Sequence, residues 1–266
     1  MVIRIISIVV GAPLFLACVY YGGLLFLCAI MLLSLLGSFE VSRMIKRMGL
    51  REVKSYLYSG ALLFPLLLHF EPSWLPGFFA FFVFSGAIIA ISRFPDFSHT
   101  DLGVNFIGLL YVSFGFAHFV LLRQMEQGML LVGYALSVIW MTDVGCFVVG
   151  TYLGKRAFLP QISPNKTVEG AVGGLIAGVA GGIGFCVFIN RRLNLDNMGF
   201  LILLTPFLSA FGQLGDLFES IFKRQARVKD SSQLIPGHGG ILDRFDSSLW
   251  VIPLLYHILR IRTTIF

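Results

Sequence analysis

The chain has 266 residues, a formal net charge of +6, 57% hydrophobic residues and a mean hydropathy of +0.86. A soluble domain is only roughly half apolar, so this composition excludes an ordinary soluble protein and predicts a polytopic, all-α integral membrane protein. We expect a single domain over residues 1–266, with the N-terminal helices in 1–125 and the helices and loops of the functional site in 126–266.

Repeated apolar runs predict the membrane spans. A spanning helix needs about 20 mostly apolar residues, and runs of about this size occur nine times, near residues 3–21, 23–42, 56–70, 76–92, 103–122, 128–150, 168–189, 198–221 and 247–260. The third run is short and contains Pro65. It is therefore also compatible with a tilted, broken or re-entrant segment.

Basic residues orient these spans. With a cytoplasmic N-terminus, fifteen of the 20 Lys and Arg residues fall on the cytoplasmic side, as the positive-inside rule favours. We therefore expect a protein of the cell (inner) membrane with a polar cavity that faces the cytoplasm. The basic loop from Arg43 to Lys54 is either a topology anchor or a surface that attracts anionic lipid.

Asp143 lies deep within the sixth predicted span. A carboxylate is costly at that depth, so it should face the protein interior or a water-filled cavity. It then serves either a functional site or a structural hydrogen bond.

The polar loop after this span contains Ser163, Lys166 and Thr167, with Glu169 just beyond it. Thr167 is predicted to be the N-cap of the next helix, and a lysine, hydroxyls and a helix N-terminus together suit a phosphate or nucleotide. Taken alone, the pattern fits an ordinary cytoplasmic loop equally well.

The seventh predicted span carries a glycine every four residues from Gly170 to Gly182. Small residues at this spacing form a groove that lets another backbone approach closely in lipid. The spacing fits a neighbouring helix of the same chain and a homodimer through this helix equally well.

The segment 216–246 concentrates most of the chemistry-bearing side chains. Asp243 and Asp246 are three residues apart, so on a helix both carboxylates leave the same face and can bind one or two hard cations. Asp216 would complete a cluster of three carboxylates, whereas Glu219 more readily supports a neighbouring base or arginine. The glycines around His238 permit a sharp turn that brings N–H groups close to an anion.

A long pattern within this segment resembles the signature of the phosphatidate cytidylyltransferases, also called CDP-diacylglycerol synthases. The matching residues are Ser220, Lys223, Arg224, Lys229, Asp230, Pro236, His238, Gly239, Gly240, Asp243, Arg244 and Asp246. The pattern of Ser163, Lys166, Thr167, Glu169 and Gly170, with Asp143 upstream, also resembles this family. Agreement at so many fixed positions is very specific.

The resemblance implies that CTP and phosphatidate are converted to CDP-diacylglycerol and pyrophosphate in phospholipid biosynthesis. It also implies that Asp216, Asp243 and Asp246 hold Mg²⁺, either alone or with a second cation. It implies no nucleic-acid partner. Lys223, Arg224, Lys229 and Arg244 are expected to neutralise phosphate charge, and His238 to contact a phosphate, orient a carboxylate or act as an acid or base. The expected substrate-binding residues are Asp143, Ser163, Lys166, Thr167, Glu169, Gly239 and Gly240.

Two other classes of function remain open at this point. A CDP-archaeol synthase or a polyprenol kinase also combines CTP with a membrane lipid, and the released product, pyrophosphate or CDP, separates nucleotidyl transfer from kinase activity. An ion-coupled transporter would also have intramembrane acids and glycine-rich helices, but such transporters often show repeated halves, and the sequence has no evident repeat.

Overall fold

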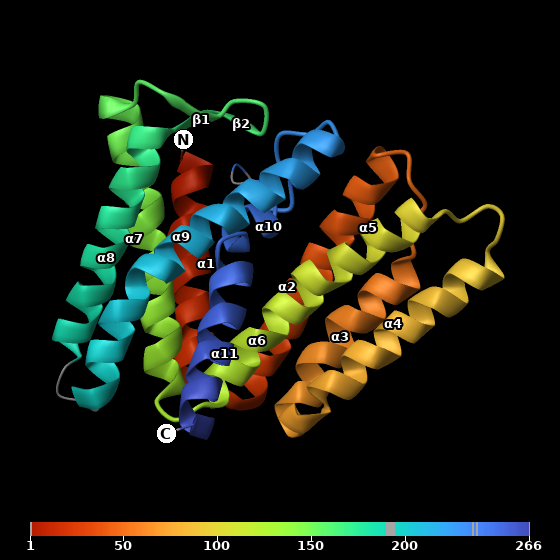
Figure 1. Cartoon of the computed structure of the whole chain (residues 1–266), viewed down its shortest axis with the longest axis horizontal. Coiled ribbons are helices and arrows are strands. Elements are labelled where there is room, and N and C mark those ends of the chain that lie inside the picture. Colours follow the sequence, from red (N-terminus) through yellow and green to blue (C-terminus); the bar gives the residue numbers. More distant parts are fainter. Residues whose placement is uncertain (1, 190–194, 236, 238, 266) are drawn as a thin grey trace. The chain divides into compact units, whose positions relative to one another are not determined.

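The computed structural model describes residues 2–189, 195–235, 237 and 239–265, and these are mainly helical (Figure 1). The helices are α1 Val2–Tyr21, α2 Gly23–Arg47, α3 Lys54–Phe70, α4 Leu75–Ser92, α5 His99–Leu109, α6 Gly115–Gln124, α7 Gly128–Leu153, α8 Val168–Phe188, α9 Leu195–Gln225, α10 Leu242–Phe245 and α11 Ser248–Ile265. A short 3₁₀ turn, Pro72–Trp74, precedes α4, and a π-helical turn, Leu110–Phe114, joins α5 to α6.

Six helical segments of the described chain are long and apolar enough to cross a membrane, which agrees with an all-α integral membrane protein. They are Gly23–Arg47, Pro72–Ser92, His99–Gln124, Gly128–Leu153, Val168–Phe188 and Met198–Gln225. The other three predicted spans correspond to α1, α3 and α11, which lie outside this set. The predicted total of nine is therefore not confirmed and stays a prediction.

Helix α3 is continuous through Pro65, so the segment is not broken there. Its 17 residues extend about 25 Å at 1.5 Å per residue, less than the roughly 30 Å of a typical hydrocarbon core. This length explains why a hydropathy pattern alone identifies the helix but does not establish a span.

The described chain divides into two compact units, Met1–Gln124 with Phe222–Phe245, and Met125–Ile221 with Asp246–Phe266. We call them unit 1 and unit 2. The segment Phe222–Phe245, which we expected to belong with the C-terminal helices, packs with the N-terminal ones. The expectation of a single domain over the whole chain stays a prediction.

Aromatic packing in unit 1 fixes the position of α10. The ring of Phe245, the last residue of α10, lies 5.3 Å from the ring centroids of both Phe15 and Phe116. Phe116 and Phe119 are fully buried on α6. Because rings at these separations pack favourably, this cluster anchors the end of the 222–245 segment among the N-terminal helices.

In unit 2, α7 and α8 lie side by side along the glycine-rich face of α8 (Figure 1). A methyl group at Gly178 would lie 2.7 Å from Oγ of Ser209, and one at Gly145 would lie 2.6 Å from the carbonyl oxygen of Gly173. The predicted packing face is therefore used within the same chain. A homodimer through this helix stays a prediction.

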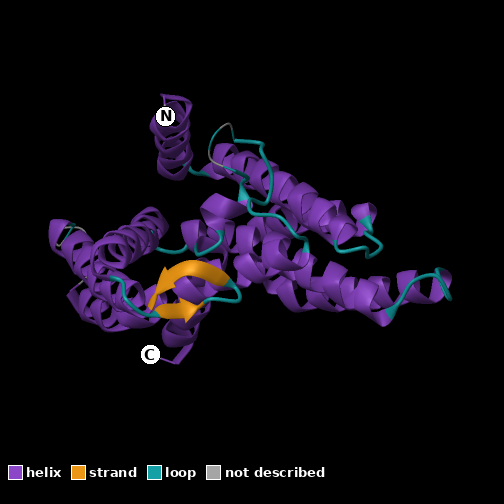
Figure 2. Cartoon of the chain, turned by 90° about the horizontal axis from the view of Figure 1, so that it is seen from above, coloured by secondary structure: helices purple, strands orange, loops and turns teal. Residues whose placement is uncertain are grey.

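The segment that we expected to be a loop forms a small antiparallel hairpin instead, drawn in orange in Figure 2. Its strands are β1 Ala157–Leu159 and β2 Ser163–Thr167. The prediction that Thr167 caps the next helix is confirmed, because its Oγ1 accepts a hydrogen bond of 3.0 Å from the backbone N–H of Gly170. This hairpin is the exception to the helical architecture of the described residues.

Candidate functional site

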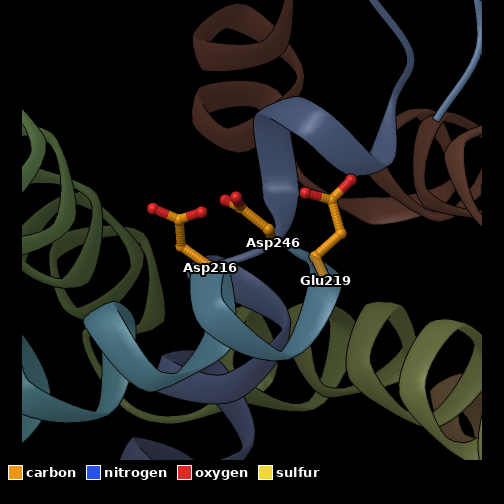
Figure 3. A group of neighbouring side chains, drawn as sticks. All are labelled: Asp216, Glu219 and Asp246. Atoms are coloured by element: carbon orange, nitrogen blue, oxygen red, sulfur yellow. The ribbon is translucent and has the colours of Figure 1, made fainter. Parts of the chain in front are cut away.

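Three carboxylates come together in unit 2. Side-chain oxygens of Asp216, Glu219 and Asp246 all lie within 4.8 Å of one another. Asp216 and Glu219 are one turn apart on α9, and Asp246 lies in the turn between α10 and α11 (Figure 3). In this view the carboxylates of Asp216 and Asp246 point toward one another, and Glu219 lies one turn along α9.

Gly215 allows α9 to approach the backbone that carries Asp246. A methyl group at position 215 would lie 2.7 Å from the carbonyl oxygen of Asp246 and 2.9 Å from Cδ1 of Trp250. Both distances are too short for ordinary contact, so glycine permits this approach. The spacing of the acidic group therefore depends on a residue without a side chain.

The donor set of this group fits a hard divalent cation, since such ions prefer carboxylate oxygens. Asp216 and Asp246 were both predicted to be metal ligands, and the structure places them together with Glu219, to which the sequence assigned a supporting role. Asp243, the third predicted ligand, belongs to unit 1. Its assignment to a metal stays a prediction.

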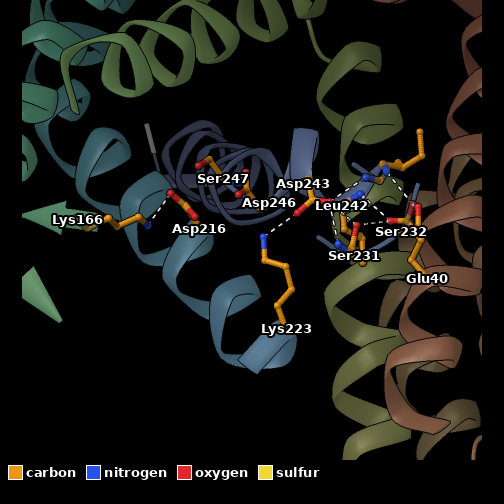
Figure 4. A network of polar contacts seen from close by, with 12 residues as sticks. Glu40, Lys166, Asp216, Lys223, Ser231, Ser232, Leu242, Asp243, Asp246 and Ser247 are labelled. Carbon is orange, nitrogen blue, oxygen red and sulfur yellow. Dashed lines mark hydrogen bonds and ion pairs between the residues drawn. The ribbon is translucent and has the colours of Figure 1, made fainter. Parts of the chain in front are cut away.

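Lys166 connects the hairpin to this acidic group. Its Nζ lies 2.5 Å from Oδ2 of Asp216, and both side chains are partly exposed (Figure 4). Strand β2 ends one residue after Lys166, and the cap at Thr167 then starts α8, so the lysine is held between two ordered elements.

The remaining predicted substrate residues in unit 2 have structural roles of their own. Ser163 pairs with Leu159 in the hairpin. Glu169 accepts hydrogen bonds from the backbone N–H groups of Lys155 (3.0 Å) and Arg156 (3.1 Å), which fixes the entry to the hairpin. Asp143 is exposed on α7. Substrate binding by these residues stays a prediction.

In unit 1, Asp243 is the centre of a polar network (Figure 4). Its Oδ1 lies 2.7 Å from Nζ of Lys223, and its Oδ2 accepts hydrogen bonds from the backbone N–H groups of Ser231 (2.9 Å) and Gly240 (2.8 Å) and from Oγ of Ser231 (2.7 Å). Burial by itself would raise the pKa of Asp243, but Lys223 and these hydrogen bonds outweigh it and lower the pKa below the ordinary value.

Glu40 is a site residue that the sequence analysis missed. It is completely buried on α2, and its carboxylate accepts hydrogen bonds from Oγ of Ser231 (3.0 Å) and Ser232 (2.6 Å). It also accepts from the backbone N–H groups of Ile241 (2.8 Å) and Leu242 (2.9 Å). Glu40 therefore holds both ends of the loop that carries the glycine-rich turn.

A signal for Glu40 was present in the sequence. It is the only acidic residue within the predicted span 23–42, and a carboxylate inside a span is expected to have a specific partner. Its partners lie in a segment about 190 residues further along the chain, which spacing alone does not reveal.

Backbone N–H groups at the end of the glycine-rich turn, those of Gly240, Ile241 and Leu242, donate to carboxylates of the chain. Gly239 has a φ of +79°, which favours glycine. The N–H of Gly240 donates to Asp243, and a side chain at Gly240 would collide with Ser231 and Glu40. The start of α10 faces the carboxylate of Glu40. Binding of an anionic ligand by this turn stays a prediction. His238, like Pro236, lies outside the described residues.

The other predicted phosphate-binding cations differ in their surroundings. Arg224, Lys229 and Arg244 are exposed, whereas the side chain of Lys223 is only 13% exposed and is paired with Asp243. Lys229 lines a cavity in unit 1 with other basic residues. Exposed cations near a glycine-rich turn are suited to contact with polyanions.

Comparison with known proteins gives a consistent result over the whole chain. The phosphatidate cytidylyltransferase of Bacillus subtilis is 37% identical over 273 residues, covering 97% of both proteins. Proteins of the same name from Staphylococcus haemolyticus and Staphylococcus epidermidis are each 36% identical and cover 96% and 99% of this chain. The model of the cytidylyltransferase family matches residues 2–262. The chain therefore belongs to the cytidylyltransferase family.

Proposed function

We propose that this protein transfers the cytidylyl group of CTP to phosphatidate, which yields CDP-diacylglycerol and pyrophosphate in phospholipid biosynthesis. Family membership and the names of the relatives support this reaction. The observation that carries the site is the group of Asp216, Glu219 and Asp246 with Lys166 paired to Asp216. In this group the three carboxylates can bind a cation, and Lys166 provides a positive charge that can bind a phosphate.

The reaction needs no strong general base. A phosphomonoester has a second pKa near 6, so the phosphate of phosphatidate is already largely ionised at neutral pH. One of its oxygens forms a bond to the α-phosphorus of CTP, and the bond from that phosphorus to the bridging oxygen of the β-phosphate breaks. The electron pair leaves with pyrophosphate.

The catalytic problem is to bring two polyanions together, so fixed cations are the natural solution. Lys166 is proposed to bind a phosphate of CTP, with Ser163 and Thr167 in support. Lys223, Arg224 and Lys229 are proposed to neutralise phosphate charge, and Arg244 to do the same or to pair with an aspartate. Asp143 would complete the polar cavity.

Asp216, Glu219 and Asp246 would hold Mg²⁺, and the sequence resemblance adds Asp243 and a second cation. When bound, a divalent ion supplies charge stabilisation for phosphate oxygens. Within unit 1, Asp243 also positions Lys223, whose Nζ lies 2.7 Å away. The chain's own contribution is thus to orient and neutralise the phosphates, in a site proposed to face the cytoplasm of the cell membrane.

A reconstituted assay tests this function. Purified protein receives phosphatidate, labelled CTP and Mg²⁺, and both liponucleotide and pyrophosphate are followed with and without chelator. We expect equal, chelator-sensitive formation of both products. Diacylglycerol, which lacks the attacking phosphate, is the matched control and should give neither. Release of CDP would contradict the proposal and indicate a kinase.

A further inference from the structure

Unit 1 contains a cavity of about 490 Å³ at the C-terminal end of α2, where the last turn of the helix is basic. Its lining includes Arg43 and Arg47 on α2 and Arg227 and Lys229 on the segment after α9, with Asp230 as its acidic member. We propose that this cavity is a binding site for the phosphate headgroup of an anionic lipid. The proposal rests on the proposed function only in taking phosphatidate as the first lipid to test.

The two arginines of α2 project from one face of the helix. Arg43 and Arg47 are four residues apart, so they lie one turn from each other on the same side. The guanidinium of Arg43 stacks 5.5 Å from the ring centroid of Phe39. Such stacking holds the planar group in place while its N–H donors remain available for a phosphate.

The opposite wall of the cavity comes from the end of α9. Arg227 has a φ of +56°, and the N–H of Val228 donates to the carbonyl oxygen of Lys223, 2.9 Å away. This turn ends the helix and leads directly into Lys229. Cations from two separate segments therefore line one cavity.

The wall formed by Ser231 and Ser232 is tied to the same helix that carries the arginines. Both serine side chains are buried and donate to Glu40. Glu40 precedes Arg43 by three residues and Arg47 by seven, which places all three on one face of α2. Because Glu40 fixes the loop, the spacing between the two walls does not depend on a ligand.

The charge of the cavity is strongly unbalanced. Over the described part of the chain, no ion pair is formed by Arg43, Arg47, Arg227 or Lys229. Four cations thus face one carboxylate. A phosphomonoester carries about −1.5 to −2 charges near neutral pH, and guanidinium groups bind its oxygens through paired hydrogen bonds. The volume lies within the usual range of about 300–1,000 Å³ for ligand pockets.

Position along α2 favours a lipid as the source of the phosphate. The candidate span Gly23–Arg47 ends at Arg47, so Arg43 and Arg47 occupy the last turns of a helix that is long and apolar enough to cross a membrane. Lipid phosphates lie at the ends of such spans. The phosphates of a nucleotide have the same chemistry and are the alternative source that the experiment separates.

The test measures binding without turnover. Wild-type protein in neutral-lipid nanodiscs is titrated with short-chain phosphatidate, with the matching diacylglycerol and, separately, with CTP. The same titrations are made with the double variant Arg43→Gln, Arg47→Gln and with the control Lys46→Gln, Lys54→Gln, which removes the same charge outside the cavity. Liponucleotide formation by wild-type protein is measured in parallel, so failure of the reaction is seen separately from failure of this site.

We expect the Arg43, Arg47 variant to bind phosphatidate at least about tenfold more weakly, with CTP binding within about twofold of wild type, because two bidentate donors are lost. The Lys46, Lys54 control should bind both ligands normally, and diacylglycerol should bind equally to all. Equal loss in the control, or unchanged phosphatidate binding in the arginine variant, would overturn the proposal. Selective loss of CTP binding would also overturn it and assign the cavity to the nucleotide.

Discussion

Oε1 of Glu40 accepts a hydrogen bond of 2.6 Å from Oγ of Ser232, a residue 192 positions further along the chain. The same carboxylate accepts from the N–H groups of Ile241 and Leu242 on the far side of the glycine-rich turn. One buried side chain thus determines where a ten-residue loop begins and ends. This makes Glu40 a positioning residue for the loop, not a catalytic residue.

Replacement of Glu40 should destabilise the protein and disorder the loop. Glu40→Ala leaves buried donors without an acceptor, at a cost of about 1–3 kcal/mol for each. We expect a lower Tm in detergent, faster protease cleavage within 231–242 and reduced kcat/KM. The control Glu71→Ala removes an exposed carboxylate whose side-chain hydrogen bonds, among the residues that the structure describes, come from Ser73. A Tm and cleavage pattern like those of wild type would contradict this role.

Loss of the acidic group in unit 2 should abolish activity without unfolding the protein. Asp216→Asn and Asp246→Asn each remove a charged ligand, and we expect a fall in kcat of about 100-fold or more. Calorimetric titration with Mg²⁺ should show weaker binding in both variants. Asp96→Asn, which removes an exposed ion pair with Arg51, is the control. Near-normal turnover by both purified variants would refute the assignment.

Glu219→Gln separates the two roles open to Glu219. A loss of Mg²⁺ affinity as deep as that of Asp216→Asn is expected, because carboxylate oxygens of the two residues lie within 4.8 Å of each other. If Glu219 instead only supports a neighbouring cation, Mg²⁺ affinity would stay normal while kcat falls modestly. The comparison is made by the same titration, with Asp96→Asn again as the control.

The network around Asp243 predicts a stability that depends on pH. Burial opposes the charged form, but Lys223 and the hydrogen bonds lower the pKa of Asp243 in the folded protein. The unfolded chain therefore binds the proton more readily. The contribution of Asp243 to the free energy of unfolding is complete above the ordinary Asp pKa of about 3.9, and it is lost as the pH falls through the lower pKa of Asp243 in the folded protein.

Measurements of Tm between neutral and strongly acidic pH test whether Asp243 makes the stability depend on pH. The wild-type Tm should fall below about pH 4, and Asp243→Asn should show a lower Tm at neutral pH with a shallower acid decline. Asp96→Asn should follow the wild-type curve. Parallel curves for wild type and Asp243→Asn would show that Asp243 is not the responsible group. In the activity assay, Asp243→Asn is expected to abolish turnover.

A methyl group at Gly215 should disturb the acidic group. Gly215→Ala places a carbon 2.7 Å from the carbonyl oxygen of Asp246, and overpacking of this kind costs about 1–3 kcal/mol. We expect a lower Tm together with weaker Mg²⁺ binding. Gly199→Ala on the same helix is the matched control, because a methyl group there has nothing within 4 Å. If both variants behave alike, the close approach at Gly215 is unimportant.

Hydropathy predicts most of the fold because membrane helices are defined by long apolar runs. The positions of α2, α4, α7 and α8 agree with the predicted spans to within a few residues. The cap at Thr167 was also predictable, since capping is local. The hairpin was missed because a short strand depends on its partner, and Ser-Pro-Asn-Lys-Thr has no strand-like alternation.

The candidate site was predicted less completely. Asp216 and Asp246 were expected to lie together, but Glu219 was placed in a supporting role and Glu40 was not recognised. Spacing along a helix relates residues three or four apart, whereas the partners of Glu40 are separated by about 190 residues or more. Such contacts are set by tertiary packing, which a single sequence does not reveal.

Glu40 depends on hydrogen-bond donors that are synthesised long after it, which bears on how the protein is made. Helix α2 leaves the ribosome long before residues 231–242, and the chain is made from its N-terminus. Until those residues arrive, the membrane holds a helix with a carboxylate that lacks its donors, which is costly in an apolar medium. The hydrogen-bond donors of Glu40 in the folded protein are thus available only after residues 231–242 have been made.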